Sequence, residues 1–421
     1  MIPGFGAAVR AAGSLVVQPR MGFADPAAMR AGLLATRDAR ATTVGTITVD
    51  SYTRVGDLAA ARRAGASGTP LNGYPIATAD PRATADVLAA AAFPVQVRHG
   101  SALPEPVFAA MAGLGLAATE GGPVSYCLPY SRVPLSRSVP SWAACVRALS
   151  EAGTDAHLET FGGCMLGQLC PPGLLVALSV LEAVFFRAHG VRDVSLSLTQ
   201  QTSPDQDLEA LHALRALAAR FLPDVTWHVV LYAYMGVYPR TGHGARALMA
   251  DAAVLAVRGG ASRLIVKTEA EAHRIPTIAE NVAALELAAA VAATTTPDPG
   301  PPADTGLLAE ATALVEAVLD LDDDVGHALV RAFAAGVLDV PFCLHADNAG
   351  RARSHLDTDG RLRWSSVGGM PIDRAGVARA PRLSSTGLLE ALGRVQRHYD
   401  SMEEDRRVLG DRPRAAALGP A

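Results

Sequence analysis

The chain has 421 residues, a formal net charge of −4 and a sequence pI near 6.3. Half of its residues are hydrophobic but only 5% are aromatic, so Ala, Leu and Val must form most of the core. This length allows one large α/β domain with an appendage, and the balanced charge argues against a nucleic-acid or anionic-membrane partner.

The cysteines and the N-terminus give no sign of export. The five cysteines show neither a Cys-x-x-Cys motif nor zinc-ligand spacing, which is typical of reduced thiols in a cytoplasmic protein. The first residues lack the basic start and long apolar stretch of a signal peptide. The apolar segment 173–188 contains Glu182 and Arg187 and is too short to span a bilayer, so we expect a buried helix and a cytoplasmic protein.

From residue 14 to about residue 290, short runs rich in Val, Ile and Thr alternate with Ala- and Leu-rich stretches of helical period. The predicted strands are 14–19, 43–49, 70–76, 94–98, 116–119, 156–160, 193–199, 227–233 and 262–267. The predicted helices include 25–38, 55–65, 82–92, 104–113, 140–152, 173–188, 206–221, 243–257 and 277–293.

This alternation predicts parallel strands joined by right-handed crossovers. About eight such units that close on themselves form a (β/α)8 barrel of the TIM type, which is the fold we predict. Nine strands compete for eight positions, and 70–76 is the one we expect to be a loop or an added strand. An open doubly wound sheet is the alternative.

A Thr- and Pro-rich stretch interrupts the pattern and can neither pack as a helix nor pair as an inner strand, so it predicts a linker. The predicted division is a barrel domain (1–293), a linker (294–304), a small α+β appendage (305–400) and a charged, frayed tail (401–421). Within the appendage, 305–337 is predicted to form two helices and 338–380 to be β-rich. We interpret the acidic run Asp320 to Asp324 between those helices as a solvated cap, in preference to a metal site.

Charged residues follow four of the predicted strands. Arg20, Arg54 and Arg98 each come after a β-rich run, and a fourth run ends in Glu120. Because strand ends on one rim of a parallel barrel converge, three guanidinium groups there would require anionic partners, and a small dicarboxylate meets that demand. Glu120 would then face a cation such as an ammonium group. Three unrelated surface arginines are the alternative.

Two further pairs are spaced four residues apart. Tyr126 and Tyr130 follow Glu120, with Pro129 stiffening the loop, and their phenols could bind carboxylate oxygens. An ordinary loop anchored by tyrosines explains them as well. Lys267 and Glu271 follow the last predicted strand and could both contact one hydroxyl-bearing ligand, or form a plain salt bridge.

The sequence has no GxGxxG after a strand, no P-loop, no HExxH and no GxSxG motif.

Taken together, these segments resemble the large (epsilon) subunit of glutamate mutase, also called methylaspartate mutase, a family of adenosylcobalamin-dependent (β/α)8 barrels. The resemblance spans roughly residues 14 to 375. The matching stretches are Gln18 to Gly22, Thr48 to Arg54, Leu71 to Pro75, Gln96 to Gly100, Glu120 to Tyr130, Met235 to Pro239, Val266 to Thr277, Asp339 to Phe342 and Asn348 to Gly350.

The resemblance implies a role for each matching residue. In that family three arginines grip both substrate carboxylates, a carboxylate meets the substrate ammonium, and two tyrosines bind the substrate. The corresponding residues here are Arg20, Arg54, Arg98, Glu120, Tyr126 and Tyr130, with His99 beside the arginines. The cofactor-binding positions correspond to Gly22, Asn72, Pro129, Tyr238 and Ile275, and the pair that holds the adenosyl ribose to Lys267 and Glu271.

Two departures from the family are visible. The family's extended N-terminal helical region is nearly absent. The family also tends to have His where this chain has Tyr232, and Phe where it has Tyr238. These departures bear on substrate orientation and cofactor fit, whereas the three arginines are complete.

The resemblance also implies a partner. Asp155-Ala156-His157 begins like the Asp-x-His-x-x-Gly motif of cobalamin-binding proteins, but Thr160 replaces the glycine and the segment is a predicted strand, so we interpret the match as chance. The cobalt ligand is therefore expected from a separate small cobalamin-binding subunit, with this chain forming a homodimer within a heterotetramer. We expect the catalytic subunit of a glutamate mutase, inactive alone, that interconverts L-glutamate and threo-3-methyl-L-aspartate.

Three rival functions stay open at this point. A related cobalamin mutase could act on another dicarboxylate such as a 2-hydroxy acid, although Glu120 argues against a substrate without an ammonium group. The chain could also be a non-catalytic barrel that serves as a scaffold or binding subunit. A metal-dependent barrel lyase or aldolase would need converging Asp, Glu and His ligands, which the sequence does not suggest.

Overall fold

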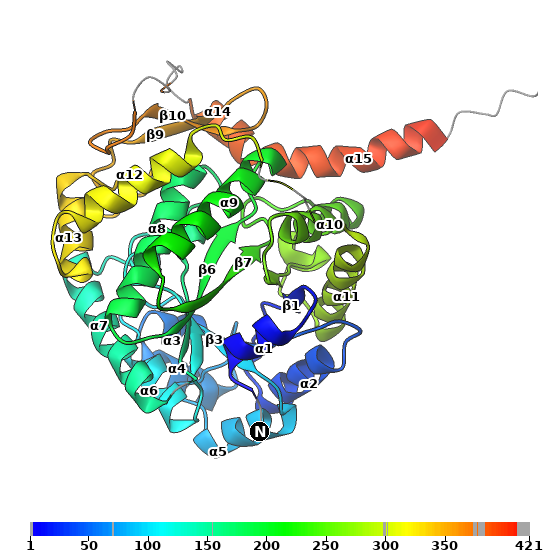
Figure 1. Cartoon of the computed structure of the whole chain (residues 1–421). Helices are drawn as coiled ribbons and strands as arrows, with labels where there is room; N and C mark the ends of the chain where they lie inside the picture. Colours follow the sequence, from blue (N-terminus) through cyan, green and yellow to red (C-terminus); the bar gives the residue numbers. More distant parts are fainter. Residues whose placement is uncertain are drawn as a thin grey trace, which may run out of the picture.

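The computed structural model describes residues 3–410 except 70, 154, 298, 299, 301, 374–376 and 378–383, and of residues 403–410 it describes the backbone only. Eight parallel strands form its centre (Figure 1). They are β1 (Val16–Gln18), β2 (Gly45–Thr48), β3 (Val95–Arg98), β4 (Ala118–Glu120), β5 (His157–Glu159), β6 (Asp193–Thr199), β7 (Thr226–Tyr232) and β8 (Arg263–Ile265).

The sheet closes into a barrel. Its hydrogen-bonded order is β1-β8-β7-β6-β5-β4-β3-β2, and a parallel bridge between Val17 and Thr43, just before β2, joins the two ends. The backbone N–H of Val17 donates to the carbonyl of Thr42 at 2.9 Å across this seam. The predicted (β/α)8 barrel is confirmed, and the open doubly wound sheet is wrong.

Helices surround the barrel as the crossover connections require. They are α1 (Phe5–Ala11), α2 (Pro26–Arg37), α3 (Ser51–Arg54), α4 (Leu58–Ser67), α5 (Pro81–Ala91), α6 (Glu105–Gly113), α7 (Leu135–Ala152), α8 (Pro172–Ala188), α9 (Pro204–Phe221), α10 (Gly242–Arg258) and α11 (Ile278–Thr294), with two short 3-10 turns, η1 (Gly162–Cys164) and η2 (Glu269–Ala272).

Two of the predicted helices differ from the prediction, and the surplus strand is identified. Residues 71–76 form a loop with a single bridge between Val49 and Tyr74, as expected for the surplus strand, and residue 70 lies outside the described residues. The predicted helix 55–65 corresponds to α4 alone, and the separate turn α3 precedes it, because Asp50 and Asp57 each cap a helix start. Helix α7 begins at Leu135, not at 140, and accommodates Pro140 in its interior.

The barrel interior is polar and fully buried. Arg263, at the start of β8, pairs with Glu159 at the end of β5, and it also donates to Gln18. Gln96 donates to Glu159 at 3.0 Å and accepts from Gln18 at 3.0 Å. Buried charges are tolerated only when they are paired and hydrogen-bonded, and this network meets that condition directly below the strand ends.

Helix α1 packs against the amino-terminal end of the barrel. Arg10 donates two hydrogen bonds to Asp193, at 2.7 and 2.9 Å. The ring of Phe5 lies 5.2 Å from that of His157 and 5.0 Å from the guanidinium of Arg263. The barrel is thus covered at this end, so a ligand must enter from the other.

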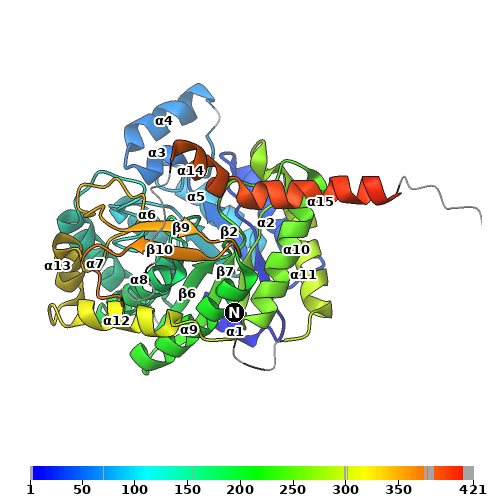
Figure 2. The ribbon, with the colours of Figure 1, turned by 90° about the horizontal axis from the view of Figure 1, so that it is seen from above.

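The C-terminal elements pack on one side of the barrel (Figures 1 and 2). They are α12 (Leu307–Leu319), α13 (Val325–Ala335), the antiparallel strands β9 (Arg353–Leu356) and β10 (Leu362–Ser366), α14 (Ser385–Leu392) and α15 (Arg394–Gly410). Figure 2 shows α15 extending away from the body. The chain is helical as far as Gly410, and 411–421 lie outside the described residues, so the charged tail predicted from residue 401 onwards stays a prediction.

The acidic run in this region caps a helix. Asp324 is the N-cap of α13 and accepts a hydrogen bond from the backbone N–H of His327 at 2.9 Å. Within the described parts of the chain, no group of three or more His, Cys, Asp or Glu residues could hold a metal ion.

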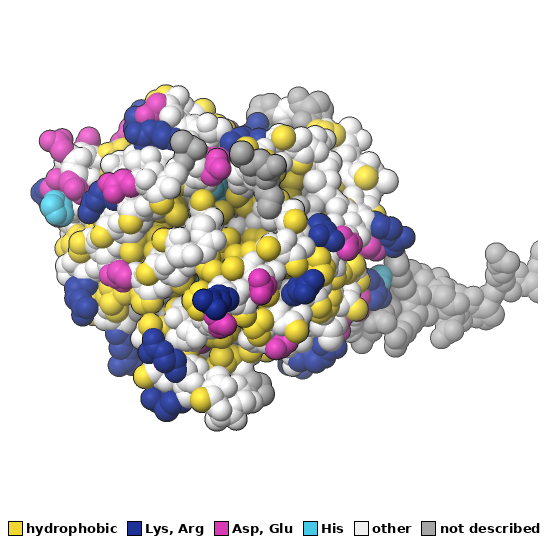
Figure 3. Space-filling view, turned by 90° about the horizontal axis from the view of Figure 1, so that it is seen from below, with side chains coloured by type: hydrophobic (Ala, Val, Ile, Leu, Met, Phe, Trp, Pro, Cys, Tyr) yellow, Lys and Arg dark blue, Asp and Glu magenta, His cyan; other side chains and the backbone are white. Residues whose placement is uncertain are grey.

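None of the described helices has the length and apolar character needed to cross a membrane. The face in Figure 3 carries basic and acidic side chains mixed among apolar ones, without a continuous patch of one sign.

Candidate active site

A cavity of about 160 Å³ opens at the carboxyl-terminal ends of the barrel strands. It is lined by Arg20, Thr48, Arg54, Arg98, His99, Gly100, Glu120, Tyr126, Tyr130, Phe161 and Met235. All seven residues predicted for the substrate site are therefore brought together, although they come from four different strand units. Drug-sized ligands occupy pockets of about 300–1,000 Å³, so this cavity suits a smaller molecule.

Local structure explains how the arginines reach the cavity. Arg20 follows β1 by two residues, and Arg98 is the last residue of β3. Arg54 does not follow its strand directly, since it lies at the end of the single turn α3. Asp50 caps that turn by accepting from the backbone N–H groups of Tyr52 and Thr53 at 2.9 and 3.0 Å, and the turn carries Arg54 back over the barrel mouth.

Three side chains contact the carboxyl group of Glu120. It is the last residue of β4, beside Arg98 on the paired strand β3, and Arg98 Nη2 lies 2.9 Å from Glu120 Oε2. The hydroxyl of Tyr126 donates to Oε1, and the hydroxyl of Tyr232 lies 2.6 Å from Oε2. Arg98 and Glu120 are only 4% and 2% exposed. This buried contact is fixed in place because separating its members would leave buried polar groups without hydrogen-bond partners.

Several buried polar atoms around the cavity have no hydrogen-bond partner among the described residues. They include Arg98 Nη1, Arg54 Nε, His99 Nε2 and Thr48 Oγ1. A buried donor without a partner costs free energy. Their gathering around one cavity indicates a ligand that is rich in hydrogen-bond acceptors, such as a carboxylate.

His99 adds a neutral donor. Its Nδ1 accepts from the backbone N–H of Ser101 at 3.1 Å, so the ring proton of neutral His99 is on Nε2. Burial, assisted by the positive charge of Arg54, lowers the pKa of His99 to about 3. His99 is therefore uncharged near neutral pH and presents an N–H group beside the arginines.

The residues predicted to bind the cofactor lie on loops at the same rim, outside the 160 Å³ cavity. Lys267 Nζ is 3.0 Å from Glu271 Oε1, and Arg20 Nη1 is 3.8 Å from the same oxygen. Lys267 also lies over the ring of Tyr238 at 5.1 Å, and the Tyr238 hydroxyl is buried without a partner among the described residues. Ile275 is 60% exposed. The Lys267–Glu271 pair is thus linked to the cavity through Arg20.

The other predicted cofactor positions are held by backbone geometry. A Cβ on Gly22 would lie 2.2 Å from the carbonyl oxygen of Thr48, so only glycine fits there. The side chain of Asn72 accepts from the backbone N–H of Ser51 at 2.9 Å and stabilises the start of α3. Pro129 is partly buried in the loop between Tyr126 and Tyr130.

Sequence reasoning missed the polar layer beneath the cavity and part of its wall. Thr48, Phe161 and Met235 line the cavity but were not predicted. Glu159 ends β5 as Glu120 ends β4, and the two carboxylate residues are paired in register. The rule that found Glu120, a charged residue at the end of a strand, would have found Glu159 too.

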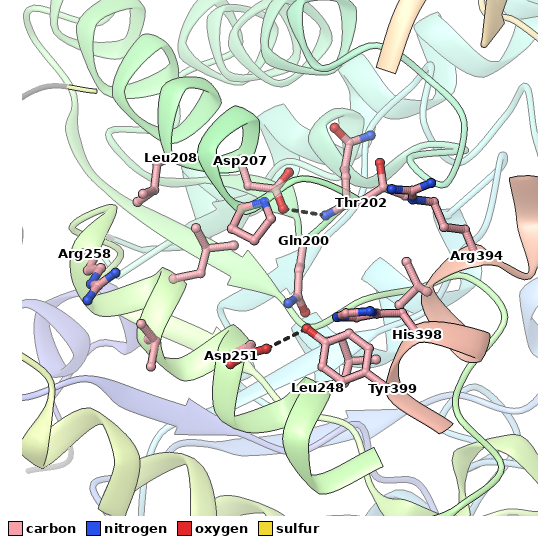
Figure 4. Close-up of a pocket in the computed structure, with 15 residues that line it drawn as sticks. Gln200, Thr202, Asp207, Leu208, Leu248, Asp251, Arg258, Arg394, His398 and Tyr399 are labelled. Carbon is pink, nitrogen blue, oxygen red and sulfur yellow. Dashed lines mark hydrogen bonds between the residues drawn. The ribbon is translucent and has the colours of Figure 1, made fainter. Parts of the chain in front are cut away.

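Two other arrangements are less suited to catalysis. Ser195, His157 and Asp193 have the spacing of a hydrolase triad, at 3.1 and 3.0 Å, but Ser195 and His157 are fully buried at the covered end of the barrel, where no substrate can reach them. A larger cavity of about 580 Å³ lies between α9, α10 and α15 (Figure 4). Its cations Arg258 and Arg394 lie on opposite sides, so they do not converge on one ligand.

The fold and the site define a class of protein: a (β/α)8 barrel with a small cavity at its mouth that three arginines line. Residues 6–383 match the model of the family "Methylaspartate mutase E chain". The chain therefore belongs to the methylaspartate mutase E chain family, which is the glutamate mutase epsilon subunit.

Its relatives carry that name. The glutamate mutase epsilon subunit of Halobacterium salinarum is 32% identical over 386 residues, which cover 86% of this chain and 80% of the relative. That of Escherichia coli O157:H7 is 30% identical over 78% of this chain and 72% of the relative, and that of Desulfitobacterium hafniense is 32% identical over 77% and 71%. A glucosidase structure from Croceicoccus marinus aligns with 11% identity and a TM-score of 0.31, too weak a likeness to inform the fold.

Proposed function

We propose that this chain is the catalytic subunit of an adenosylcobalamin-dependent glutamate mutase that interconverts L-glutamate and threo-3-methyl-L-aspartate. The observation that carries the proposal is the meeting of Arg20, Arg54 and Arg98 around one small cavity that also contains Glu120. L-Glutamate has the two carboxylates and the single ammonium group that these four residues require. The family and the names of its relatives agree with this substrate.

The arginines act as positioning groups. A guanidinium can donate two parallel hydrogen bonds to one carboxylate, which fixes both the distance and the angle. Arg54 Nε and Arg98 Nη1 are the unpartnered donors that a substrate carboxylate would satisfy. Holding both ends of the substrate keeps the parts of a rearranging carbon skeleton within reach of one another. The buried floor of the cavity also limits the access of water to a reactive species.

Glu120 and the aromatic groups complete the site. Glu120 would accept a hydrogen bond from the substrate ammonium, since the donors Arg98 and Tyr126 do not fill all of its lone-pair positions. Tyr126 and Tyr130 line the cavity with their rings 6.3 Å apart, so they both shape it and present hydroxyl groups to it.

Residues on the rim of the barrel would hold the cofactor. Adenosylcobalamin, when bound, supplies an organic radical through homolysis of its cobalt–carbon bond, which no side chain of the barrel could provide. Lys267 and Glu271 would hold the ribose hydroxyl groups, and the unpartnered hydroxyl of Tyr238 adds a polar contact. The exposed Ile275, together with Gly22, Asn72 and Pro129 on the other rim loops, would face the corrin. The cobalt ligand would come from a small cobalamin-binding partner in a heterotetramer.

Reconstitution tests the proposal. The purified chain is mixed with the small cobalamin-binding subunit and adenosylcobalamin, and formation of 3-methylaspartate from L-glutamate is followed. We expect turnover only when all three components are present, and no turnover of 2-hydroxyglutarate. Turnover of 2-hydroxyglutarate without turnover of L-glutamate would instead establish the rival mutase on a hydroxy acid, and binding of cobalamin with neither activity would establish a non-catalytic barrel.

A further inference from the structure

Tyr232 stands between two buried carboxylates. It is the last residue of β7 and is 1% exposed. Its hydroxyl oxygen lies 2.6 Å from Oε2 of Glu120 and also contacts Oε1 of Glu159. These carboxylate residues end the neighbouring strands β4 and β5 in register. One phenol thus joins a residue of the cavity wall to the polar layer below it.

If both carboxylates were ionised, the two contacts of Tyr232 would share a single hydrogen atom. A phenol has a single O–H proton and can donate it to only one acceptor. If Glu120 and Glu159 were both ionised, one of the two contacts with Tyr232 would bring together two oxygens with no hydrogen between them. One additional proton, carried by a carboxyl group, satisfies both contacts.

The surroundings place that proton on Glu120. Glu159 pairs with Arg263 on β8 and is also close to the charge of Arg98, and both cations lower its pKa against the effect of burial. The pKa of Glu120 is raised by burial and by the charge of Glu159, in spite of Arg98. Glu159 also accepts from Gln96 and Ser195, and Glu120 from Tyr126. The protonated Glu120 would donate to Tyr232, and Tyr232 would donate to the ionised Glu159.

We propose that Tyr232 links Glu120 and Glu159 through a shared proton in the free site, and that this proton is released when a substrate ammonium group binds. The inference rests on the proposed function, because it assumes an amino-acid substrate. On binding, the O–H bond of Glu120 breaks, its proton passes to solvent, and the ammonium group donates hydrogen bonds both to the ionised Glu120 and to the oxygen of Tyr232. Charge is balanced, since one ammonium replaces one proton.

This linkage makes Tyr232 a positioning residue that also discriminates between substrates. A 2-hydroxy acid brings a neutral hydroxyl group in place of the ammonium. It could therefore bind while Glu120 keeps its proton, and no proton would be released. Binding of an amino acid requires the ionisation of Glu120, so the amino acid binds more weakly as the pH falls.

Calorimetry measures this proton directly. L-Glutamate is titrated into the complex of this chain with the small cobalamin-binding subunit, loaded with methylcobalamin so that no rearrangement takes place. Titrations in buffers of different ionisation enthalpy, between about pH 6 and about pH 8.5, give the number of protons released. We expect the release of at most one proton per site, greatest at the lowest pH and smaller as the pH rises, and close to none for 2-hydroxyglutarate.

The matched variants are Tyr232→Phe and Tyr126→Phe. Each removes one hydroxyl that contacts Glu120, but only Tyr232 also contacts Glu159. We expect Tyr232→Phe to diminish the proton release and Tyr126→Phe to retain it while weakening binding. In the adenosylcobalamin-loaded complex, the rise in KM for L-glutamate at low pH should flatten in Tyr232→Phe only.

The possible failures are distinct. Binding of L-glutamate to the wild-type complex without proton release, or undiminished release in Tyr232→Phe, would overturn the inference and leave the proposed function intact. If Tyr232→Phe does not fold, the wild-type comparison of L-glutamate with 2-hydroxyglutarate decides alone, because equal proton release by both also overturns the inference. Absence of L-glutamate binding by the wild-type complex would overturn the proposed function and the inference together.

Discussion

The two terminal nitrogens of Arg98 have different surroundings. Nη2 contacts Glu120 at 2.9 Å, whereas Nη1 is buried beside the cavity without a partner among the described residues. A lysine has one point charge and cannot fill both positions. We expect Arg98→Lys to lower kcat/KM for L-glutamate by at least about 10- to 100-fold, the size of one hydrogen bond to a charged group. Steady-state kinetics of the reconstituted complex measure this.

Arg40→Lys provides the control for that substitution. Arg40 is an exposed arginine whose partner is Glu286, 2.7 Å away, far from the strand ends that form the cavity. Its replacement should leave kcat/KM unchanged. Near-normal turnover in Arg98→Lys would contradict the role proposed for the arginines.

At the scale of residues, the sequence predicted the residues that line the cavity better than the buried polar residues beneath them. Arg20, Arg98 and Glu120 could be found because a polar residue after a β-rich run is visible in one dimension. Tyr232 could not be assigned a partner, because its contact with Glu159 joins β7 to β5 across the barrel interior. Such contacts depend on the stagger of the strands, which the sequence pattern does not reveal.

At the scale of elements, helix α8 connects two loops of the site. The carboxylate of Glu182, fully buried in α8, accepts from the backbone N–H groups of Ser125 at 2.9 Å, Phe161 at 3.1 Å and Gly162 at 2.8 Å. Ser125 precedes Tyr126, and Phe161 lines the cavity. The predicted helix 173–188 is confirmed in position. The sequence pattern shows Glu182 only as an interruption of an apolar segment and does not reveal its contacts.

Glu182 makes a pH dependence testable. Burial raises its pKa to about 7, above the value of 4.5 for a free carboxyl group. A raised pKa means that the folded protein binds the proton more tightly than the unfolded chain, so this contribution to stability is present below about pH 4.5 and is lost as the pH rises to about 7. In Glu182→Gln the titration is absent. We expect the free energy of unfolding of wild type, relative to the variant, to fall across this range by at most about 3 kcal/mol.

Chemical denaturation of both proteins at a series of pH values measures this difference. The variant should also turn over L-glutamate more slowly at every pH, because an amide has one accepting oxygen and its NH2 group cannot accept, so the contact with Ser125 or those with Phe161 and Gly162 are lost. A difference in unfolding free energy that does not change with pH would show that Glu182 does not titrate in this range.

Short elements were the least predictable. Helix α3 has four residues and owes its position to the cap provided by Asp50, not to a periodic apolar pattern. Helix α1 was not predicted, because its seven residues are too few to show a helical period. Both matter for the site, since α3 delivers Arg54 and α1 covers the opposite end of the barrel.

At the scale of the whole molecule, the repeated alternation of strand and helix was sufficient to predict the fold, but barrel closure was not. The seam between β1 and β2 is a single bridge, Val17 to Thr43, so nothing in either segment distinguishes a closed sheet from an open one. The division into a barrel, a linker and an appendage stays a prediction. Closure has a functional consequence, because it brings the ends of β1 and β3 to one mouth.

The barrel mouth should also be the surface that receives the small subunit. The residues expected to face the cofactor lie there, and the partner must approach the same rim to supply the cobalt ligand. Exposed apolar side chains occur on loops of this rim: Val55 is 73% exposed, Ile275 60% and Val237 42%. Exposed apolar residues grouped on one face are typical of a binding surface.

Val55→Asp tests this orientation. Val55 directly follows α3 and contributes to neither the cavity nor the predicted cofactor positions. Burial of one valine contributes about 1.5–3 kcal/mol, so the variant should bind the cobalamin-loaded small subunit on the order of 10- to 100-fold more weakly. Leu308→Asp, on the exposed side of α12, is the control and should bind normally. Sedimentation of the variants with increasing small subunit gives both affinities. Equal affinities would place the partner elsewhere on the barrel and remove the rim from the proposed cofactor site.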